Sequence, residues 1–218
     1  MAEATIDATG LMVLSFREAD ALDALTARII PGDDADPGAR EAGVVTYIDR
    51  ALAGPYAEWR LAYREGLRLV DAFAEATYGK RLGQLAEDNQ DEALAALQED
   101  RVPGFAEGDG ARFFDMIWAH TIEGMFSDPA YGGNRNAVGW RLIGFPGAQY
   151  GYSADEMRYG ADLTAKPIMT LADIRRLARE RPELFYQRPD TRPAPGRDET
   201  PAMPSAEATL ESDQSQGG

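Results

Sequence analysis

The sequence feature that most constrains the fold is the stretch from Ala119 to Gly147, which reads AHTIEGMFSDPAYGGNRNAVGWRLIGFPG. Apolar residues at helical spacing lead into it and predict an amphipathic helix. Pro129 disfavours helical backbone angles at the preceding residue, so we expect this helix to end near Ser127. The glycines and asparagines that follow tolerate positive φ angles and permit an irregular path. Large apolar side chains then return, and their surface must be buried in this chain or against another one.

The rest of the chain predicts an all-α fold, because no segment alternates apolar and polar residues with enrichment in β-branched types. We expect an irregular bundle of about five to seven helices around one long central helix, roughly Tyr56 to Tyr78. Gly66 lies in the middle of that helix, where glycine costs about 1 kcal/mol relative to alanine, and this predicts a close crossing with a second helix. The apolar stripe of the long helix comprises Trp59, Ala62, Tyr63, Gly66, Leu67, Val70, Phe73 and Ala74.

Capping residues predict where several helices begin. Ser15 followed by Glu18 has the spacing of a capping box and should open the first helix. Asp36 followed by Pro37 is typical of an N-cap and first helical position, so a second helix is expected to begin there. A short helix is expected from Thr170 to Glu180.

The chain divides into four predicted segments. Residues 1–14 form a flexible N-terminus, and residues 15–150 form a helical core that includes the glycine-rich stretch. Residues 151–186 form a helical extension. Residues 187–218 consist of proline, charged and small polar residues with few apolar anchors, which predicts a disordered tail or an extended C-terminal arm.

Composition excludes several classes of function. The formal net charge of −15 argues against nucleic acid or an anionic membrane surface as partner, since both attract basic patches. The absence of cysteine excludes disulfides, a thiol nucleophile and cysteine-ligated metal centres in this chain. The N-terminal residues lack the basic and apolar regions of a signal peptide, and no apolar run approaches the roughly 18 residues that a membrane span requires.

His120 is the only histidine, and its spacing from Glu123 places both on one helical face. The pair could act as an acid/base pair or half a metal site, or it could be a structural hydrogen-bonded pair or a polar contact to a partner. A single histidine cannot supply the ligands of a carboxylate-bridged di-iron centre or of an H-E-x-x-H zinc site. The acidic loop from Asp33 to Asp36 lacks the ligand order of a calcium-binding EF-hand.

The glycines do not form a known phosphate-binding motif. The segment from Gly132 to Arg135 could form an anion-binding nest, or a backbone turn that presents Tyr131, Arg135 and Trp140 to another surface. No G-x-S-x-G motif is present, and nothing favours assembly of a serine triad. We therefore predict no catalytic, cofactor-binding or metal-binding residue in this chain.

Aromatic residues and arginine, which anchor many protein interfaces, gather in and around the glycine-rich stretch. Composition alone does not separate an interface from a packed core, so both roles stay open. The candidate partner-binding residues are Trp118, His120, Glu123, Phe126, Tyr131, Asn134, Arg135, Trp140 and Phe145.

The segment EGMFSDPAYGGNRNAVGWRLIGFPG resembles the signature of the gluconate 2-dehydrogenase subunit 3 family. The resemblance continues upstream in Leu25–Leu52, Tyr78–Leu82 and Phe113–Thr121, and it covers roughly residues 22–147. It implies a non-catalytic small subunit of a membrane-associated, FAD-dependent dehydrogenase complex that oxidises a sugar, a polyol or gluconate.

The resemblance also implies the partners and the location. The large subunit is a flavoprotein of the glucose–methanol–choline type that holds FAD, and a haem c subunit or an iron–sulfur cluster passes its electrons on. The small subunit holds no cofactor, helps the flavoprotein to mature, and wraps it with residues 151–186. The complex is expected on the periplasmic side of the inner membrane if a partner carries the export signal, and otherwise in the cytoplasm.

Two alternatives from other classes stay open. One is a free-standing helical metal- or ligand-binding protein that uses His120 and Glu123, with an acidic residue such as Glu65. The other is a free-standing helical ligand-binding domain without an obligate partner.

Overall fold

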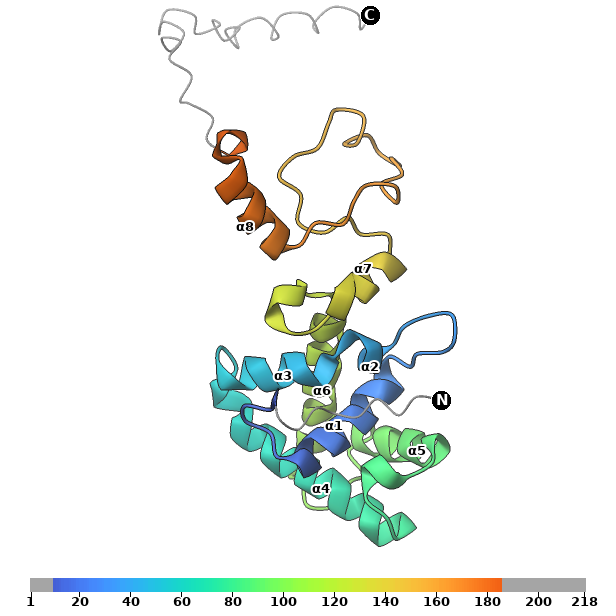
Figure 1. The fold of residues 1–218 in the computed structure, drawn as a ribbon. Coiled ribbons are helices and arrows are strands. Elements are labelled where there is room, and N and C mark those ends of the chain that lie inside the picture. The colour runs from blue at the N-terminus through green and yellow to red at the C-terminus, as the bar shows by residue number, and fades with distance from the viewer. Residues whose placement is uncertain (1–9, 186–218) are drawn as a thin grey trace, which may run out of the picture.

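The structure is a computed structural model that describes residues 10–185 of the 218-residue chain. The predicted all-α class is confirmed: within these residues the chain is helical, and its β-type pairing is an isolated parallel bridge between Gly147 and Met169 (Figure 1). The α-helices are α1 (Phe16–Ile29), α2 (Ala39–Ala42), α3 (Val44–Ala53), α4 (Arg60–Tyr78), α5 (Glu87–Gln98), α6 (Asp109–Phe126), α7 (Val138–Leu142) and α8 (Leu171–Glu180). The 3-10 helices are η2 (Ala57–Trp59), η3 (Leu82–Gln84), η4 (Pro129–Tyr131), η5 (Arg135–Ala137) and η6 (Pro182–Leu184).

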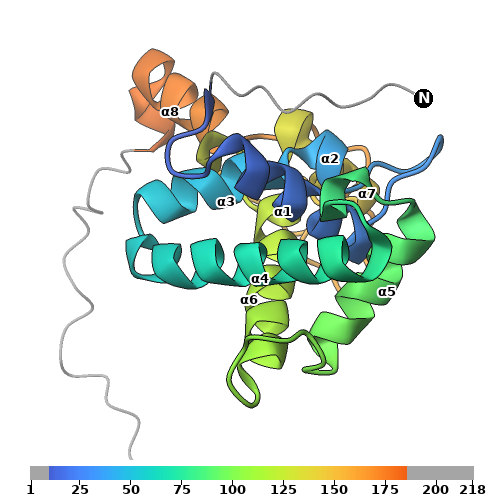
Figure 2. The same cartoon turned by 90° about the horizontal axis from the view of Figure 1, so that it is seen from below.

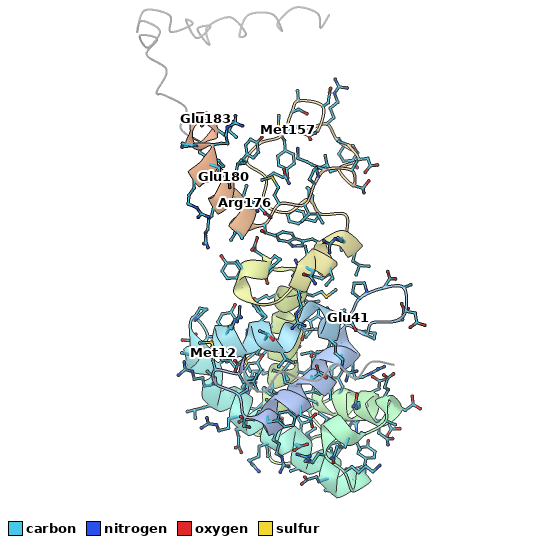
Figure 3. The ribbon with its side chains drawn as sticks, in the orientation of Figure 1. Met12, Glu41, Met157, Arg176, Glu180 and Glu183 are labelled. Carbon is cyan, nitrogen blue, oxygen red and sulfur yellow. The ribbon has the colours of Figure 1, made fainter. Side chains whose placement is uncertain are left out.

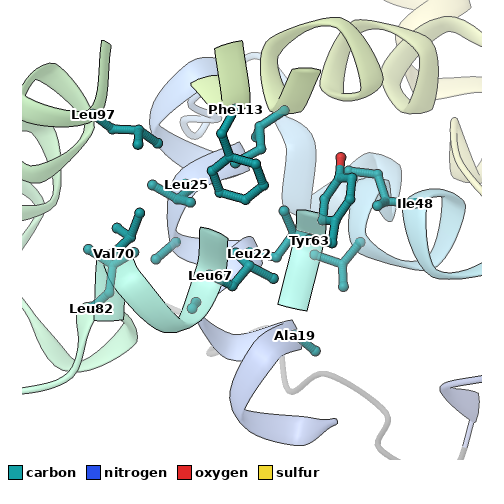
Figure 4. Packing of buried hydrophobic residues seen from close by; sticks show 14 of the residues in the cluster. Ala19, Leu22, Leu25, Ile48, Tyr63, Leu67, Val70, Leu82, Leu97 and Phe113 are labelled. Atoms are coloured by element: carbon teal, nitrogen blue, oxygen red, sulfur yellow. The ribbon is translucent and has the colours of Figure 1, made fainter. Parts of the chain in front are cut away.

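The first helix begins at the predicted capping box. The Ser15 hydroxyl accepts a hydrogen bond from the backbone N–H of Glu18, and the Glu18 carboxylate accepts one from the Ser15 N–H at 2.7 Å. From this start α1 runs through the bundle and packs against α2, α3, α4, α5 and α6. The core that surrounds it is shown in Figure 4, where Leu22 and Leu25 of α1 lie among residues of α3, α4 and α6.

The long helix is also confirmed, as η2 followed directly by α4. Its C-terminus is at Gly79, which adopts the left-handed conformation with φ 73°. The buried stripe begins one turn later than the sequence pattern predicts, because Trp59 and Ala62 are exposed and Tyr63 is the first member that is fully buried.

Gly66 marks the predicted close crossing, and the second helix is α6. Figure 2 shows α4 lying across α6. The ring of Phe113 on α6 occupies the space beside the glycine, and a Cβ atom built there would lie 2.4 Å from the ring atoms Cε1 and Cζ. The missing side chain therefore allows the two helices to approach each other.

The predicted start of the second helix at Asp36 and Pro37 is wrong. Asp33 folds the acidic loop on itself instead, since its carboxylate accepts the backbone N–H groups of Ala35 and Asp36. The helix then begins after Gly38, and it is interrupted at Gly43, whose φ of 72° separates α2 from α3.

Part of the predicted flexible N-terminus is held in place. The buried carboxylate of Asp49 on α3 accepts the backbone N–H groups of Met12, Val13 and Leu14 at 2.6 to 2.9 Å. Residues 1–9 of that segment, and the predicted disordered tail beyond residue 186, lie outside the described residues.

After α7 the chain leaves the bundle, and we call residues 148–185 the extension (Figure 1). The predicted last helix is confirmed as α8, whose N-cap Thr170 forms a capping box with Asp173. Ser153 and Glu156 also form both hydrogen bonds of a capping box, but turns rather than a helix follow them. The extension contains no fully buried residue.

We expect Gly66→Ala to destabilise the protein by about 1–3 kcal/mol, because the added methyl group overlaps the Phe113 ring. Helix propensity alone predicts the opposite, a gain of about 1 kcal/mol. Urea unfolding followed by circular dichroism measures the difference. The same change made in a Phe113→Leu background should cost less, and a single Gly66→Ala variant more stable than the wild type would contradict the crossing.

Candidate partner-binding site

His120 and Glu123 lie one turn apart on α6, and the structure surrounds both with tyrosines. The hydroxyl of Tyr63, from α4, lies 2.8 Å from His120 Nδ1. The Tyr56 ring stacks on the imidazole with a centroid distance of 4.5 Å and an interplanar angle of 11°. With only 8% of its surface exposed, His120 lies within the protein.

Glu123 forms the second half of this polar cluster. Its carboxylate Oε2 accepts hydrogen bonds from the hydroxyls of Tyr47 at 2.9 Å and Tyr56 at 3.0 Å. Tyr47 belongs to α3 and Tyr56 to the turn after it, so the pair on α6 is connected to α3 and α4 as well. The cluster fixes the position of three helices relative to one another.

Burial sets the protonation of the cluster. It lowers the pKa of His120 below its ordinary value of 6.5, although the charge of Glu123 opposes this shift. Burial first, and then Glu123, raise the pKa values of Tyr47, Tyr56 and Tyr63. At neutral pH the imidazole is therefore uncharged, and the tyrosines keep the protons that they donate.

Of the roles considered for His120 and Glu123, this geometry fits a structural hydrogen-bonded pair. Among residues 10–185, no group of three or more histidines and carboxylates is placed to hold a metal ion. The nitrogen Nδ1 and both carboxylate oxygens of the pair are occupied by tyrosine hydroxyls. The pair thus serves as a buried hydrogen-bonded link between helices.

The segment Glu123–Gly147, which we call the signature segment, closes the C-terminal end of α6. The last carbonyl groups of a helix have no partner within it and need one from elsewhere. Here the backbone N–H of Asn134 donates to Gly124 O at 2.8 Å, and Trp140 Nε1 donates to Phe126 O at 2.7 Å. The side-chain amide of Asn134 donates to Ser127 O at 2.8 Å. The signature segment therefore completes the helix that precedes it.

Its glycines and asparagines are needed for this close approach. A Cβ atom at Gly133 would lie 2.2 Å from Gly124 O, and one at Gly139 would lie 2.1 Å from Met125 O. Asn134 itself adopts a left-handed conformation with φ 43°, which asparagine tolerates better than most residues. Gly133, Asn134 and Gly139 are therefore explained by packing within this chain.

The turn from Gly132 to Arg135 does not form the alternative predicted for it, an anion-binding nest. The backbone N–H of Gly132 donates to Pro129 O, and that of Asn134 donates to Gly124 O, so both amides are used inside the protein. The guanidinium of Arg135 lies against Gly43, at the junction of α2 and α3. The segment is a backbone turn.

The candidate partner-binding residues fall into two groups in the structure. Asn134, Trp140 and His120 are buried, and Glu123 and Phe126 are partly buried. The exposed candidates are Trp118 at 51%, Tyr131 at 55%, Phe145 at 42%, and Arg135. Their contact with a partner stays a prediction, and only the exposed group offers side chains to one without rearrangement.

Sequence reasoning missed further exposed apolar residues at the end of the signature segment and in the extension. The aromatic residues of this part of the chain, which shows neither helical nor strand periodicity, could have indicated them. The largest are Leu142, Ile143, Tyr150, Tyr152, Met157 and Tyr159.

It also missed Asp128, which joins the extension to the signature segment. One carboxylate oxygen of Asp128 accepts the N–H of Ala130, and the other accepts the N–H of Leu171 at the start of α8. This bond spans 43 residues of sequence, so spacing gives no indication of it.

The fold and this site define a class of small all-α protein in which a glycine-rich segment closes the end of a helix that crosses the core. The family model described as gluconate 2-dehydrogenase subunit 3 matches residues 17–147. The chain belongs to that family, as its resemblance predicted. Comparisons with curated proteins and with solved structures find no match. In residues 10–185, no helix is both long enough and apolar enough to cross a membrane.

We expect Trp140→Phe to lower the free energy of unfolding by about 1–3 kcal/mol, because it leaves the partly buried carbonyl of Phe126 without its indole donor. Trp118→Phe is the matched control: Trp118 is half exposed, and its replacement should change stability by about 0.5 kcal/mol or less. Urea unfolding of both variants tests the assignment. Equal effects would show that the indole N–H does not close α6.

Acid should weaken the fold through His120. Because its pKa is lowered in the folded state, the unfolded chain binds a proton at this ring first as the pH falls below 6.5. The stability contribution is therefore complete above that pH and is lost as the pH falls further. The free energy of unfolding should decline more steeply between about pH 7 and about pH 5 in the wild type than in His120→Asn. Parallel curves would contradict the burial of a neutral imidazole, since the chain contains one histidine.

Proposed function

We propose that this chain is the non-catalytic small subunit of a membrane-associated, FAD-dependent dehydrogenase complex that acts on a sugar, a polyol or gluconate. Its partner is a large flavoprotein of the glucose–methanol–choline type. Membership of the gluconate 2-dehydrogenase subunit 3 family supports the proposal, since the family name describes a dehydrogenase subunit. The main observation in support of the proposal is that the extension, which follows the residues matched by the family model, contains no fully buried residue.

An extension of this kind exposes apolar surface that a monomer rarely leaves uncovered. Met157 is 69% exposed, Tyr150 is 55% exposed, and Tyr159 is exposed over its whole side chain. Tyrosine is among the residue types that anchor interfaces most strongly. In the signature segment, Tyr131, Ile143 and Phe145 are exposed as well. An obligate subunit contact typically buries roughly 2,000 Å² or more, and these groups would supply the apolar centre of one.

The contribution of the chain to the complex would be binding rather than chemistry. By binding only the folded flavoprotein, it lowers the population of unfolded and aggregating flavoprotein by mass action. The FAD accepts the electrons of the substrate within the large subunit. In the signature segment, Gly133 and Gly139 lie against carbonyl groups of α6, and the N–H groups of Gly132 and Asn134 donate to backbone oxygens of this chain.

The free-standing metal-binding alternative has less support. His120 and Glu123 are occupied by three tyrosine hydroxyls, and the described part of the chain brings no third ligand to them. The structural role of the pair accounts for its burial and its contacts.

Co-expression with the neighbouring flavoprotein reading frame, with a tag on this chain, tests the proposal. We expect a yellow complex that contains FAD and that does not form without this chain. Met157→Ala/Tyr159→Ala should reduce the recovered FAD at least tenfold, because it removes two anchors of the interface. Leu61→Ala is the control, since Leu61 is 74% exposed on α4, away from the extension.

One result would overturn the proposal: purification of this chain alone as a soluble, monodisperse protein, together with a flavoprotein that folds and turns over equally well without it. Equal recovery of FAD with the extension variant and with the wild type would instead remove Met157 and Tyr159 from the interface and leave the subunit role standing.

A further inference from the structure

We propose that α8 is an electrostatic docking helix, whose outward arginines bind a cluster of carboxylates on the surface of the flavoprotein and set the orientation in which the two subunits meet. This inference rests on the proposed function. It identifies the part of the chain that directs docking and the chemistry of the surface that receives it.

The sequence of α8, LADIRRLARE, is amphipathic. Leu171, Ile174 and Leu177 are partly buried, and the helix packs against η4 of the signature segment. Arg175, Arg176 and Arg179 are exposed on the remaining face. Figure 3 shows α8, with Arg176 and Glu180 labelled, beyond the end of the helical bundle. The arginines therefore lie on the exposed face of α8, and the opposite face of the helix packs against η4.

Two of these arginines lack an acidic partner in the part of the chain that the structure describes. Arg176 pairs with Asp173 at 2.9 Å, but no ion pair to residues 10–185 is formed by Arg175 or Arg179. These two are four residues apart on the helix, a spacing at which like charges repel and destabilise it. Carboxylates on a partner would relieve this repulsion and gain charge-assisted hydrogen bonds.

The helix is held in position before any partner binds. Its first N–H, from Leu171, donates to the Asp128 carboxylate at 2.7 Å. Just before it, Ala148 N donates to Met169 O at 2.7 Å, and Met169 N donates to Pro146 O at 3.0 Å. These bonds close the base of the loop formed by residues 149–168. A preorganised helix loses less entropy on binding than a free one.

Within the described residues, the charge differs between the body of the protein and the extension. Residues 10–147 carry 23 acidic and 13 basic side chains, whereas the extension carries six of each. Within α5, Glu87, Asp88, Asp91 and Glu92 occur without a basic residue. Figure 1 shows α5 at the opposite end of the molecule from α8. An acidic partner surface is therefore repelled less by the neutral extension than by the acidic body, and Arg175 and Arg179 of α8 supply the local attraction.

A folded protein fits this surface better than an anionic lipid membrane does. The loop beside α8 carries the exposed carboxylates of Asp155 and Asp162, and a uniformly anionic headgroup layer would face them together with the arginines. A protein can place a local cluster of carboxylates opposite the arginines alone. A second copy of this chain fits less well too. Pairing of α8 with the acidic α5 of another copy would be head-to-tail and would propagate into open chains rather than close.

The test is the charge reversal R175E/R179E in the full-length chain, co-expressed with the flavoprotein. The control R68E/R112E changes the net charge equally at two exposed arginines on α4 and α6. We expect the docking variant to raise the Kd of the complex at least tenfold in 0.05 M NaCl, while the control changes it less than threefold. The difference should shrink in 0.5 M NaCl, where the charges are screened. Unchanged circular dichroism and Tm establish that both variants fold.

Each outcome has a distinct meaning. If the wild type binds the flavoprotein and R175E/R179E binds it with the same Kd and salt dependence, the docking helix is wrong and the proposed function stands. If the wild type binds no flavoprotein, the proposed function is wrong and this inference falls with it. Self-association of the wild type in 0.05 M NaCl that R175E/R179E abolishes would assign α8 to a second copy. Co-sedimentation with phosphatidylglycerol vesicles, lost in R175E/R179E while the Kd is unchanged, would assign it to lipid.

Discussion

The structure depends on how the C-terminal carbonyl groups of α6 find their hydrogen-bond donors. Asn134 and Trp140 supply donors to Gly124, Phe126 and Ser127, and this requirement places the signature segment against the end of the helix. The glycines at the contact follow, because any side chain there would overlap a carbonyl oxygen. The same segment then presents Asp128 to α8. The termination of α6 thus accounts for the path of the signature segment and, through Asp128, for the position of α8.

Structural features that involve only residues close together in the sequence could be predicted from the sequence. The Ser15–Glu18 capping box, the end of α6 before Pro129 and the cap at Thr170 each require only residues within one helical turn. The predicted helix start at Asp36 is wrong because the Asp33 carboxylate accepts the backbone N–H groups of Ala35 and Asp36. Helix-capping preferences alone do not include this competing interaction. The close crossing at Gly66 was predictable from its cost, but the residue that fills the space, Phe113, was not.

The site was predictable only in part, for the same reason. Helical spacing places His120 beside Glu123, but the tyrosines that bind them come from elements 57 to 76 residues away. Composition gives Trp118 and Trp140 equal weight as interface anchors. The structure separates them, since one indole N–H closes α6 and the other ring is half exposed. Burial depends on which residues surround a side chain in the folded protein, and a local sequence pattern does not specify those residues.

The body and the extension are stabilised in different ways. The body buries a continuous apolar core together with the cluster around His120, which offsets the conformational entropy lost on folding. In the extension, ordering costs on the order of 1 kcal/mol per residue, and no fully buried side chain offsets it. The partly buried face of α8 against η4 and the bonds at Asp128 and Met169 hold this helix in place before a partner binds. The loop of residues 149–168 has no fully buried side chain, so burial against a partner would stabilise the loop more than it stabilises α8. The loop and the partner that buries it would then stabilise each other.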